Sequence, residues 1–190
     1  AVVSKDDGPR AGTTLEALSQ LKPVFRPDGR ATAGNACPLN DGAAAVVVMS
    51  DTKARELGLT PLARIVSTAV TGLSPEVMGH GPADAIKLAL KRAGKGVDDI
   101  DLYEINEAFA SQVLSSQREV GIDLEKLNVS GGAIAVGHPL ASSGVRLMTQ
   151  LSRQFAERPD VRYGLTAMCI GIGMGGTVIW ENPAWEGVAQ

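Results

Sequence analysis

Alternating strand-like and helix-like segments run from Pro61 onward, and this order constrains the fold more than any other feature of the sequence. Short apolar segments predict strands, and segments with apolar residues three or four positions apart predict helices. The expected strands are residues 63–70, 101–105, 127–130, 163–170 and 175–180, and the expected helices are 82–93, 107–120 and 142–157. Alternation favours parallel strands, whereas two adjacent closing strands favour an antiparallel edge. The sequence therefore predicts an α/β fold with a mixed five-stranded sheet.

The first 58 residues follow a different pattern and predict a separate unit. Residues 1–40 are rich in loop-forming residues, with one short helix expected at 14–21. Residues 42–49, GAAAVVVM, are apolar on both faces, which predicts a strand buried inside a covered sheet. Ser50 is expected to cap a short helix that ends at Gly58. We therefore divide the chain into residues 1–58 and residues 59–190.

Charge and hydropathy exclude several classes of partner. The 190 residues carry a net charge of −3, so neither nucleic acid nor an anionic membrane is expected as a partner. No apolar run reaches the roughly 18 residues that a membrane span needs, and the first residues lack a signal-peptide pattern. A cytoplasmic location is expected. The two cysteines, Cys37 and Cys169, match no zinc spacing, which predicts reduced thiols and no metal site.

Three motifs follow predicted strands, and the first is Asn106-Glu107-Ala108-Phe109-Ala110. In open α/β sheets ligands bind at the carboxyl ends of strands, so a polar pair at this junction is well placed for chemistry. Asn106 could hold a water through its amide. It could also serve only as a helix cap, which is the common role of asparagine before a helix.

The second motif, GGAIAVGHPLASSG at residues 131–144, contains His138, one of only two histidines in the chain. Pro139 suits the first position of a helix, which would place His138 at a helix amino terminus. The positive end of the helix dipole would disfavour the imidazolium there, leaving a neutral histidine available as a base at pH 7. The alternative is a buried histidine whose hydrogen bonds are satisfied by the backbone.

The third motif, Cys169-Ile170-Gly171-Ile172-Gly173, ends the strand expected at 163–170. A cysteine followed by alternating glycines can expose its sulfur and present backbone N–H groups to an oxyanion. The alternative is a buried structural cysteine, the usual role of this residue type. Because all three motifs end strands of one sheet, their joint placement favours a functional site.

With these motifs the chain resembles the carboxyl-terminal half of the thiolase family of acyl-CoA acyltransferases. The resemblance also rests on Gly34-Asn35-Ala36 followed by Asn40-Asp41-Gly42-Ala43-Ala44-Ala45, and it runs from Gly8 to Glu181. It implies cleavage of a 3-ketoacyl-CoA by CoA to a shortened acyl-CoA and acetyl-CoA, or the reverse condensation. Such chemistry needs a base, an acid and stabilised oxyanions.

The resemblance also implies roles for individual residues. His138 would activate the nucleophile and, with a water held by Asn106, bind a thioester oxygen. Cys169 would exchange the α-proton of the acetyl unit, and the Gly171 N–H would contribute to a second oxyanion hole. Phe109 would form a wall beside the reacting thioester.

Contacts to CoA follow from the same resemblance. Arg10 would lie near the nucleotide end of CoA, although a solvated surface arginine is an equal alternative. Ala36 and Cys37 would border the pantetheine arm, and Met78 would line the acyl pocket. His80 is expected to be a loop histidine. CoA thioesters are expected as substrates, with no tightly bound cofactor.

The chain departs from the thiolase pattern in several places. The half that carries the acylated cysteine is missing, and Cys37 lacks the glycine-rich turn into a helix that would lower its pKa. We therefore expect a partner that supplies the missing amino-terminal half, within a homodimer or homotetramer. A non-catalytic CoA- or lipid-binding subunit is the alternative function. Ala141 and Ile172 replace glycines of the family, and Ile172 would be strained if its φ were positive.

Overall fold

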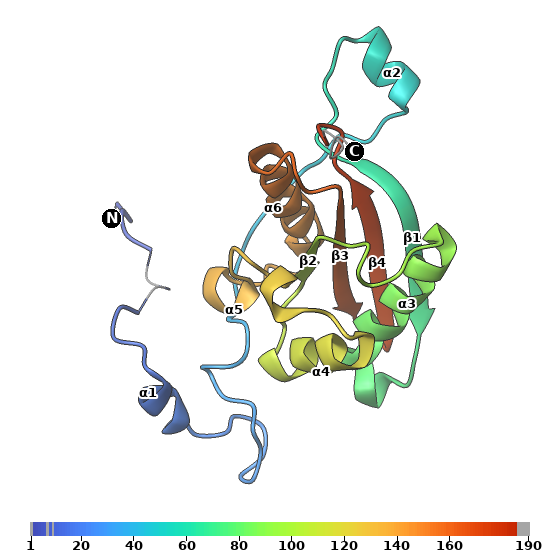
Figure 1. Ribbon diagram of the computed structural model, residues 1–190. Helices are drawn as coiled ribbons and strands as arrows, with labels where there is room; N and C mark the ends of the chain where they lie inside the picture. Colours follow the sequence, from blue (N-terminus) through green and yellow to red (C-terminus); the bar gives the residue numbers. More distant parts are fainter. Residues whose placement is uncertain (1, 7, 9, 186–190) are drawn as a thin grey trace.

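The folded body of the chain is built on a mixed sheet, seen in a computed structural model that describes residues 2–6, 8 and 10–185 (Figure 1). Its strands are β1 (Arg64–Gly72), β2 (Leu102–Ile105), β3 (Tyr163–Ile170) and β4 (Met174–Glu181), arranged in the order β1-β4-β3-β2. β4 is antiparallel to both β1 and β3, and β2 is parallel to β3. The predicted α/β fold with a mixed sheet is therefore confirmed.

Helices cover both faces of this sheet (Figure 1). One face is covered by α3 (Gly81–Ala93) and α4 (Ala110–Val120), and the other by α6 (Ser143–Glu157). Both α3 and α4 end at a glycine with positive φ, Gly94 at 63° and Gly121 at 83°, as expected for helix C-caps. Shorter elements join them: the 3₁₀ helices η1 (Pro75–His80) and η2 (Leu124–Lys126), and the single-turn helix α5 (Ala133–Val136).

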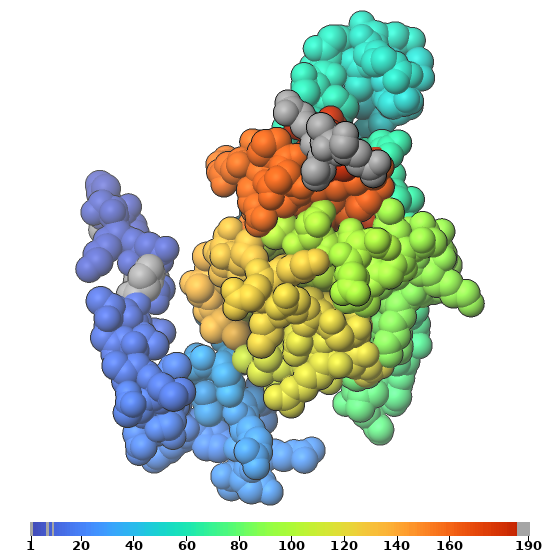
Figure 2. Space-filling view, viewed as in Figure 1, coloured from blue at the N-terminus to red at the C-terminus, as the bar shows by residue number. Residues whose placement is uncertain are grey.

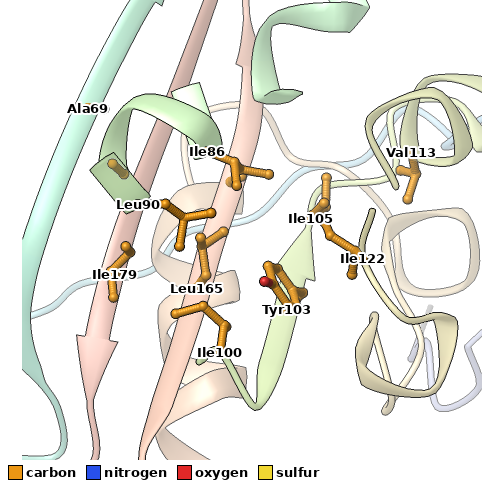
Figure 3. Packing of buried hydrophobic residues seen from close by; sticks show 12 residues of the cluster. Ala69, Ile86, Leu90, Ile100, Tyr103, Ile105, Val113, Ile122, Leu165 and Ile179 are labelled. Atoms are coloured by element: carbon orange, nitrogen blue, oxygen red, sulfur yellow. The ribbon is translucent and has the colours of Figure 1, made fainter. Parts of the chain in front are cut away.

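Each face of the sheet buries its own apolar cluster. The larger cluster lies under α3 and α4 and joins Ile86 and Leu90 to Tyr103 of β2 and Leu165 of β3 (Figure 3). The smaller cluster lies under α6 and is formed by Leu102, Leu151, Phe155, Val161 and Trp180. Burying a large apolar side chain contributes about 1.5–3 kcal/mol. These two clusters therefore hold the strand ends, and the residues that follow them, in place.

The predicted fifth strand at residues 127–130 is wrong, because only Leu127 pairs with the sheet, through an isolated parallel bridge to Tyr103. The next residue, Asn128, adopts a left-handed conformation with φ of 47° and turns the chain away. Its side chain takes the place of a strand: Oδ1 accepts a hydrogen bond from Ile105 N at 2.8 Å, and Nδ2 donates to Ile105 O at 2.9 Å. The sheet of the described residues thus has four strands.

Residues before the sheet lie largely outside the folded body (Figures 1 and 2). They contain α1 (Leu15–Ser19), capped by Thr14, and α2 (Asp51–Glu56), capped by Ser50 and projecting from one end of the molecule. The strand predicted at residues 42–49 is absent, and Val47 is 80% exposed. An apolar segment forms a buried strand only where a neighbouring sheet covers it, and in the described part of the chain the segment pairs with neither edge strand, β1 nor β2. The division at residue 58 stays a prediction.

Among the described residues, no helix is both long and apolar enough to span a bilayer.

Candidate active site

The candidate site lies at the carboxyl ends of β2 and β3. Asn106 follows β2 directly, and its backbone N–H donates to the Ala167 carbonyl of β3 at 2.9 Å. Cys169 lies two residues further along β3, so both residues belong to the same edge of the sheet. Both side chains are buried, that of Asn106 completely. Two of the three motifs therefore end at neighbouring strand tips, which is where open α/β sheets bind ligands.

His138 lies on the loop between α5 and α6, and this loop needs glycine at the preceding position. Gly137 has φ of 98°, and a Cβ there would collide with the side chain of Asn40. Asn40 Oδ1 instead accepts a hydrogen bond from His138 N at 3.2 Å. A residue of the amino-terminal segment thus fixes the backbone of the histidine loop.

The prediction that His138 stands at a helix amino terminus is wrong, because α6 begins at Ser143. The carbonyl of Pro139 accepts hydrogen bonds from the backbone N–H groups of Ser142 and Ser143, at 2.9 and 3.0 Å. These contacts form a turn before the helix starts, and the imidazole lies beside that turn. The helix dipole is therefore not what keeps the ring neutral.

The burial of His138 favours the neutral form of the ring that the sequence predicted. Desolvation of the half-buried ring lowers the pKa of His138 below its ordinary value of 6.5, and the positive charge of Arg146 lowers that pKa further. The ring contacts two side chains, with Nε2 3.2 Å from Asn106 Nδ2 and Nδ1 2.6 Å from Ser143 Oγ. The imidazole and the amide of the first two motifs are therefore in direct contact.

The two thiols lie beside the same strand ends. Ala36 forms an isolated bridge with Phe109, and Cys37 N donates to the Ala108 carbonyl at 3.0 Å. Burial raises the pKa of Cys37 and of Cys169 above the ordinary thiol value, and repulsion from the thiolate form of Cys37 would raise the pKa of Cys169 further. Both cysteines are free and protonated at neutral pH.

The loop after Cys169 connects the site to η1. Gly171, Ile172 and Gly173 form the turn between β3 and β4, and Ile172 has φ of 69°. Gly173 O accepts a hydrogen bond from Leu73 N at 2.9 Å, just before η1, the element that carries Met78. The positive φ expected to strain Ile172 is therefore present.

Two residues lie apart from this group. Arg10 is exposed on the amino-terminal segment, where its carbonyl accepts a hydrogen bond from Thr13. His80 ends η1 instead of lying in a loop, and its ring contacts Glu119 and Ser115 of α4. Within the described residues, no group of three or more potential metal ligands is found.

Comparison with known proteins decides the family. The profile described as "Thiolase, C-terminal domain" matches residues 59–182, and "Thiolase, N-terminal domain" matches residues 1–52. The chain belongs to the thiolase family. The resemblance drawn from the motifs is confirmed.

Other thiolases show the same relationship. The chain is 54% identical over 182 residues to the 3-ketoacyl-CoA thiolase of Cronobacter sakazakii, covering 93% of this chain and 46% of that protein. It is 54% identical over 170 residues to the acetyl-CoA acetyltransferase of Pseudomonas aeruginosa, covering 90% of this chain and 43% of that one. A crystal structure of human mitochondrial 3-ketoacyl-CoA thiolase in complex with CoA matches with a TM-score of 0.90 and 46% identity, covering 95% of this chain and 45% of that one. The chain therefore spans about half the length of the thiolases it matches.

The candidate site includes polar residues that sequence reasoning missed. Arg146 of α6 donates from Nη2 to Asn106 Oδ1 at 3.3 Å and from Nη1 to Gln150 Oε1 at 3.4 Å. Gln150 and Gln154 in turn donate to the buried carboxyl of Glu104 at 3.0 and 2.8 Å. A signal was present in the sequence, because residues 146, 150 and 154 are polar at a spacing of four and so share one face of the helix. These residues form a partly buried polar network that reaches Asn106, the residue in contact with His138.

Proposed function

We propose that this chain forms the His138-bearing part of an acyl-CoA acyltransferase of the thiolase type. The enzyme would cleave a 3-ketoacyl-CoA with CoA to give a shortened acyl-CoA and acetyl-CoA, or catalyse the reverse condensation. The observation that carries the proposal is the 3.2 Å contact between His138 Nε2 and the Asn106 amide at the strand ends of a thiolase fold. The names of its relatives, a 3-ketoacyl-CoA thiolase and an acetyl-CoA acetyltransferase, support it.

In this proposal His138 is the base. Because burial and Arg146 lower its pKa, the imidazole is uncharged at neutral pH and its Nε2 can accept the proton of a nucleophilic thiol. Together with a water held by Asn106, the ring then donates to the thioester oxygen. Phe109, which lies edge-on to Phe25 with ring centroids 6.2 Å apart, forms an apolar wall beside that thioester.

Cys169 is the acid for the departing acetyl unit. Its raised pKa keeps a proton on sulfur at neutral pH, and the thiol can give that proton to the developing carbanion of acetyl-CoA. The backbone N–H of Gly171, two residues further on, stabilises the oxyanion formed at the same time. In the condensation direction the Cys169 thiolate removes the α-proton instead.

The acylated nucleophile comes from another polypeptide segment. Both cysteines of this chain have raised pKa values, so neither supplies a thiolate readily. We propose that an amino-terminal thiolase half supplies it, within a homodimer or homotetramer that acts in fatty-acid metabolism, including β-oxidation, in the cytoplasm. CoA would be a substrate, bound by Arg10 and the segment containing Ala36 and Cys37 with Met78 at the acyl end, and no cofactor would be tightly bound.

The test is turnover of a 3-ketoacyl-CoA by the purified protein together with any chain that accompanies it. Mass spectrometry should detect acetyl-CoA and the shortened acyl-CoA only when free CoA is added. His138→Ala should lower the rate by about 10²–10⁴-fold or more, because base and hydrogen-bond donor are lost together. His80→Gln, which changes the other histidine of the chain, should retain most of the activity.

Two results would contradict the proposal. Unchanged turnover in His138→Ala would remove its base. Binding of CoA without any product, in a preparation that contains both halves, would instead favour the alternative of a CoA- or lipid-binding subunit.

A further inference from the structure

A continuous chain of hydrogen bonds runs from α6 through the imidazole and back to the start of α6. Arg146 Nη2 contacts Asn106 Oδ1 at 3.3 Å, and Asn106 Nδ2 contacts His138 Nε2 at 3.2 Å. On the other side of the ring, His138 Nδ1 contacts Ser143 Oγ at 2.6 Å, and Ser143 Oγ contacts the Pro139 carbonyl at 3.0 Å. The two ends of this chain have fixed roles, since a guanidinium only donates and a carbonyl only accepts.

These fixed ends determine the position of every proton between them. Because Arg146 only donates, the oxygen of the Asn106 amide must face the guanidinium, and the NH₂ group must face the ring. His138 Nε2 therefore accepts, so the ring proton sits on Nδ1 and is donated to Ser143 Oγ. The hydroxyl proton of Ser143 then goes to the Pro139 carbonyl, which completes the chain with no conflict.

The opposite tautomer conflicts with the same contacts. A proton on Nε2 would face the Asn106 NH₂ group, and turning the amide over would direct that group at the Arg146 guanidinium instead. Either arrangement places two donors against each other where the Asn106 side chain has no access to solvent. A buried polar group without a partner costs about 1–3 kcal/mol, so one tautomer is strongly preferred.

The side chain of Arg146 is itself held by other residues, so its guanidinium has a fixed position relative to the Asn106 amide. Its Nη1 contacts Gln150, which donates to the Glu104 carboxyl and to the Gly131 carbonyl. The carboxyls of Glu104 and Glu107 both interact favourably with its charge. Glu107 is fixed too, since it accepts hydrogen bonds from Asn128 Nδ2 at 3.0 Å and Ile134 N at 3.1 Å.

We propose that Arg146 is a positioning residue that orients the Asn106 amide and thereby fixes His138 in the tautomer protonated at Nδ1. The consequence for catalysis rests on the proposed function: Nε2 then carries a lone pair instead of a proton, and it can take the proton of the nucleophilic thiol when that thiol replaces the Asn106 amide as its donor. Arg146 touches no reacting atom in this scheme and acts only through Asn106. The tautomer itself is a property of the chain and does not depend on the reaction.

The test is the tautomeric state of His138, measured from the ¹⁵N shifts of imidazole-labelled protein above pH 8, where the ring is neutral. Only this chain is labelled, in whatever complex it is purified, so only two histidines give signals, and His80→Gln assigns them. The unmodified protein should show His138 protonated at Nδ1. Arg146→Met should shift the tautomer ratio toward Nε2 by roughly tenfold or more, because the amide loses its orienting donor.

Three further variants complete the experiment. Arg146→Lys keeps a donor and a charge and should restore part of the original ratio. Ser143→Ala removes the acceptor for Nδ1–H and should shift the ratio in the same direction as Arg146→Met, so it replaces that variant if the latter does not fold. Arg153→Met changes an exposed arginine of the same helix and should leave the ratio unchanged.

The outcomes separate the proposal from the function it serves. A proton on Nε2 in the unmodified protein, or an unchanged ratio in both Arg146→Met and Ser143→Ala, would overturn the positioning role whether or not the protein turns over substrate. The expected ratios in a protein without thiolase activity would overturn the function and leave the positioning role intact. In an active protein, Arg146→Met should lower kcat with little change in KM for CoA.

Discussion

Ile172 is a β-branched residue in a backbone conformation that favours glycine. Its φ is 69°, and its side chain is 87% exposed in the turn between β3 and β4. A left-handed conformation costs an L-residue roughly 1–2 kcal/mol, and the exposed side chain recovers little of this by packing. The turn therefore holds backbone strain within three residues of Cys169.

Replacing this residue with glycine should stabilise the fold. We expect Ile172→Gly to raise the free energy of unfolding by roughly 1 kcal/mol, since glycine adopts positive φ without steric conflict. Urea denaturation followed by circular dichroism measures the change. Val77→Gly is the matched control, because Val77 is also exposed but has φ of −118°, and it should give no gain. A loss of stability in Ile172→Gly would show that the turn is not strained.

At the scale of elements, the apolar pattern predicted most strands and helices because each packs against another element of the same chain. Strands 163–170 and 101–105 and helix 82–93 were predicted to within a residue or so, since their apolar residues fill the two clusters on the sheet. Residues 127–130 failed because Asn128 pairs with β2 through its side chain, which no strand pattern anticipates.

The candidate site shows the same limit. The motifs located Asn106, His138 and Cys169, because short polar residues, glycines and proline stand out against apolar strands. Arg146, Gln150 and Gln154 were missed because their role depends on Glu104 of a strand more than 40 positions away, a contact that only the folded chain reveals. Their spacing of four residues could have identified the shared face of the helix, but not its partner on β2.

The carboxyl of Glu104 on β2, which accepts hydrogen bonds from α6, predicts that the stability of the fold depends on pH. Burial raises the pKa of Glu104 from 4.5 to about 7. Between these values the folded chain holds a proton that the unfolded chain releases, so the contribution of Glu104 to stability is complete below pH 4.5 and declines as pH rises to 7. The full difference corresponds to roughly 3 kcal/mol.

Glu104→Gln should abolish this decline. Denaturation at several pH values between 4.5 and 7.5 measures it as the difference between the unmodified protein and the variant, in which the opposite effect of His138 cancels. Glu157→Gln, at the exposed end of α6, should follow the unmodified protein. Parallel pH profiles for the unmodified protein and Glu104→Gln would show that Glu104 is ionised throughout this range.

At the scale of the whole molecule, the segment 42–49 is the apolar segment that stays largely exposed in the described part of the chain. Its apolar sequence predicted a buried strand, yet Val46, Val47 and Val48 are at least half exposed. Exposed apolar patches of this kind usually mark an interaction surface. The chain covers 46% of a related thiolase, and under the proposed function the amino-terminal thiolase half is the partner that we expect to cover this segment.

Val47→Glu should therefore weaken association without unfolding the body. The melting temperature of the isolated chain should change by no more than about a degree or two, because an exposed substitution alters stability by less than ~0.5 kcal/mol. Light scattering should show a smaller mass, or loss of a copurifying amino-terminal half. Thr52→Glu on the exposed helix α2 adds the same single negative charge and is the charge-matched control. Equal masses for the unmodified protein and both variants would exclude the segment from the interface.

Because both thiols of this chain have raised pKa values, alkylation can show whether a preparation contains another polypeptide with a more reactive cysteine. Cys37 and Cys169 are the two cysteines of the chain, and burial leaves each with little thiolate at neutral pH. Alkylating reagents attack the thiolate, so iodoacetamide should modify this chain slowly and faster as the solution becomes alkaline. Rapid alkylation of a preparation at pH 7 would therefore mark a cysteine carried by some other polypeptide, and peptide mapping of the label would identify which one.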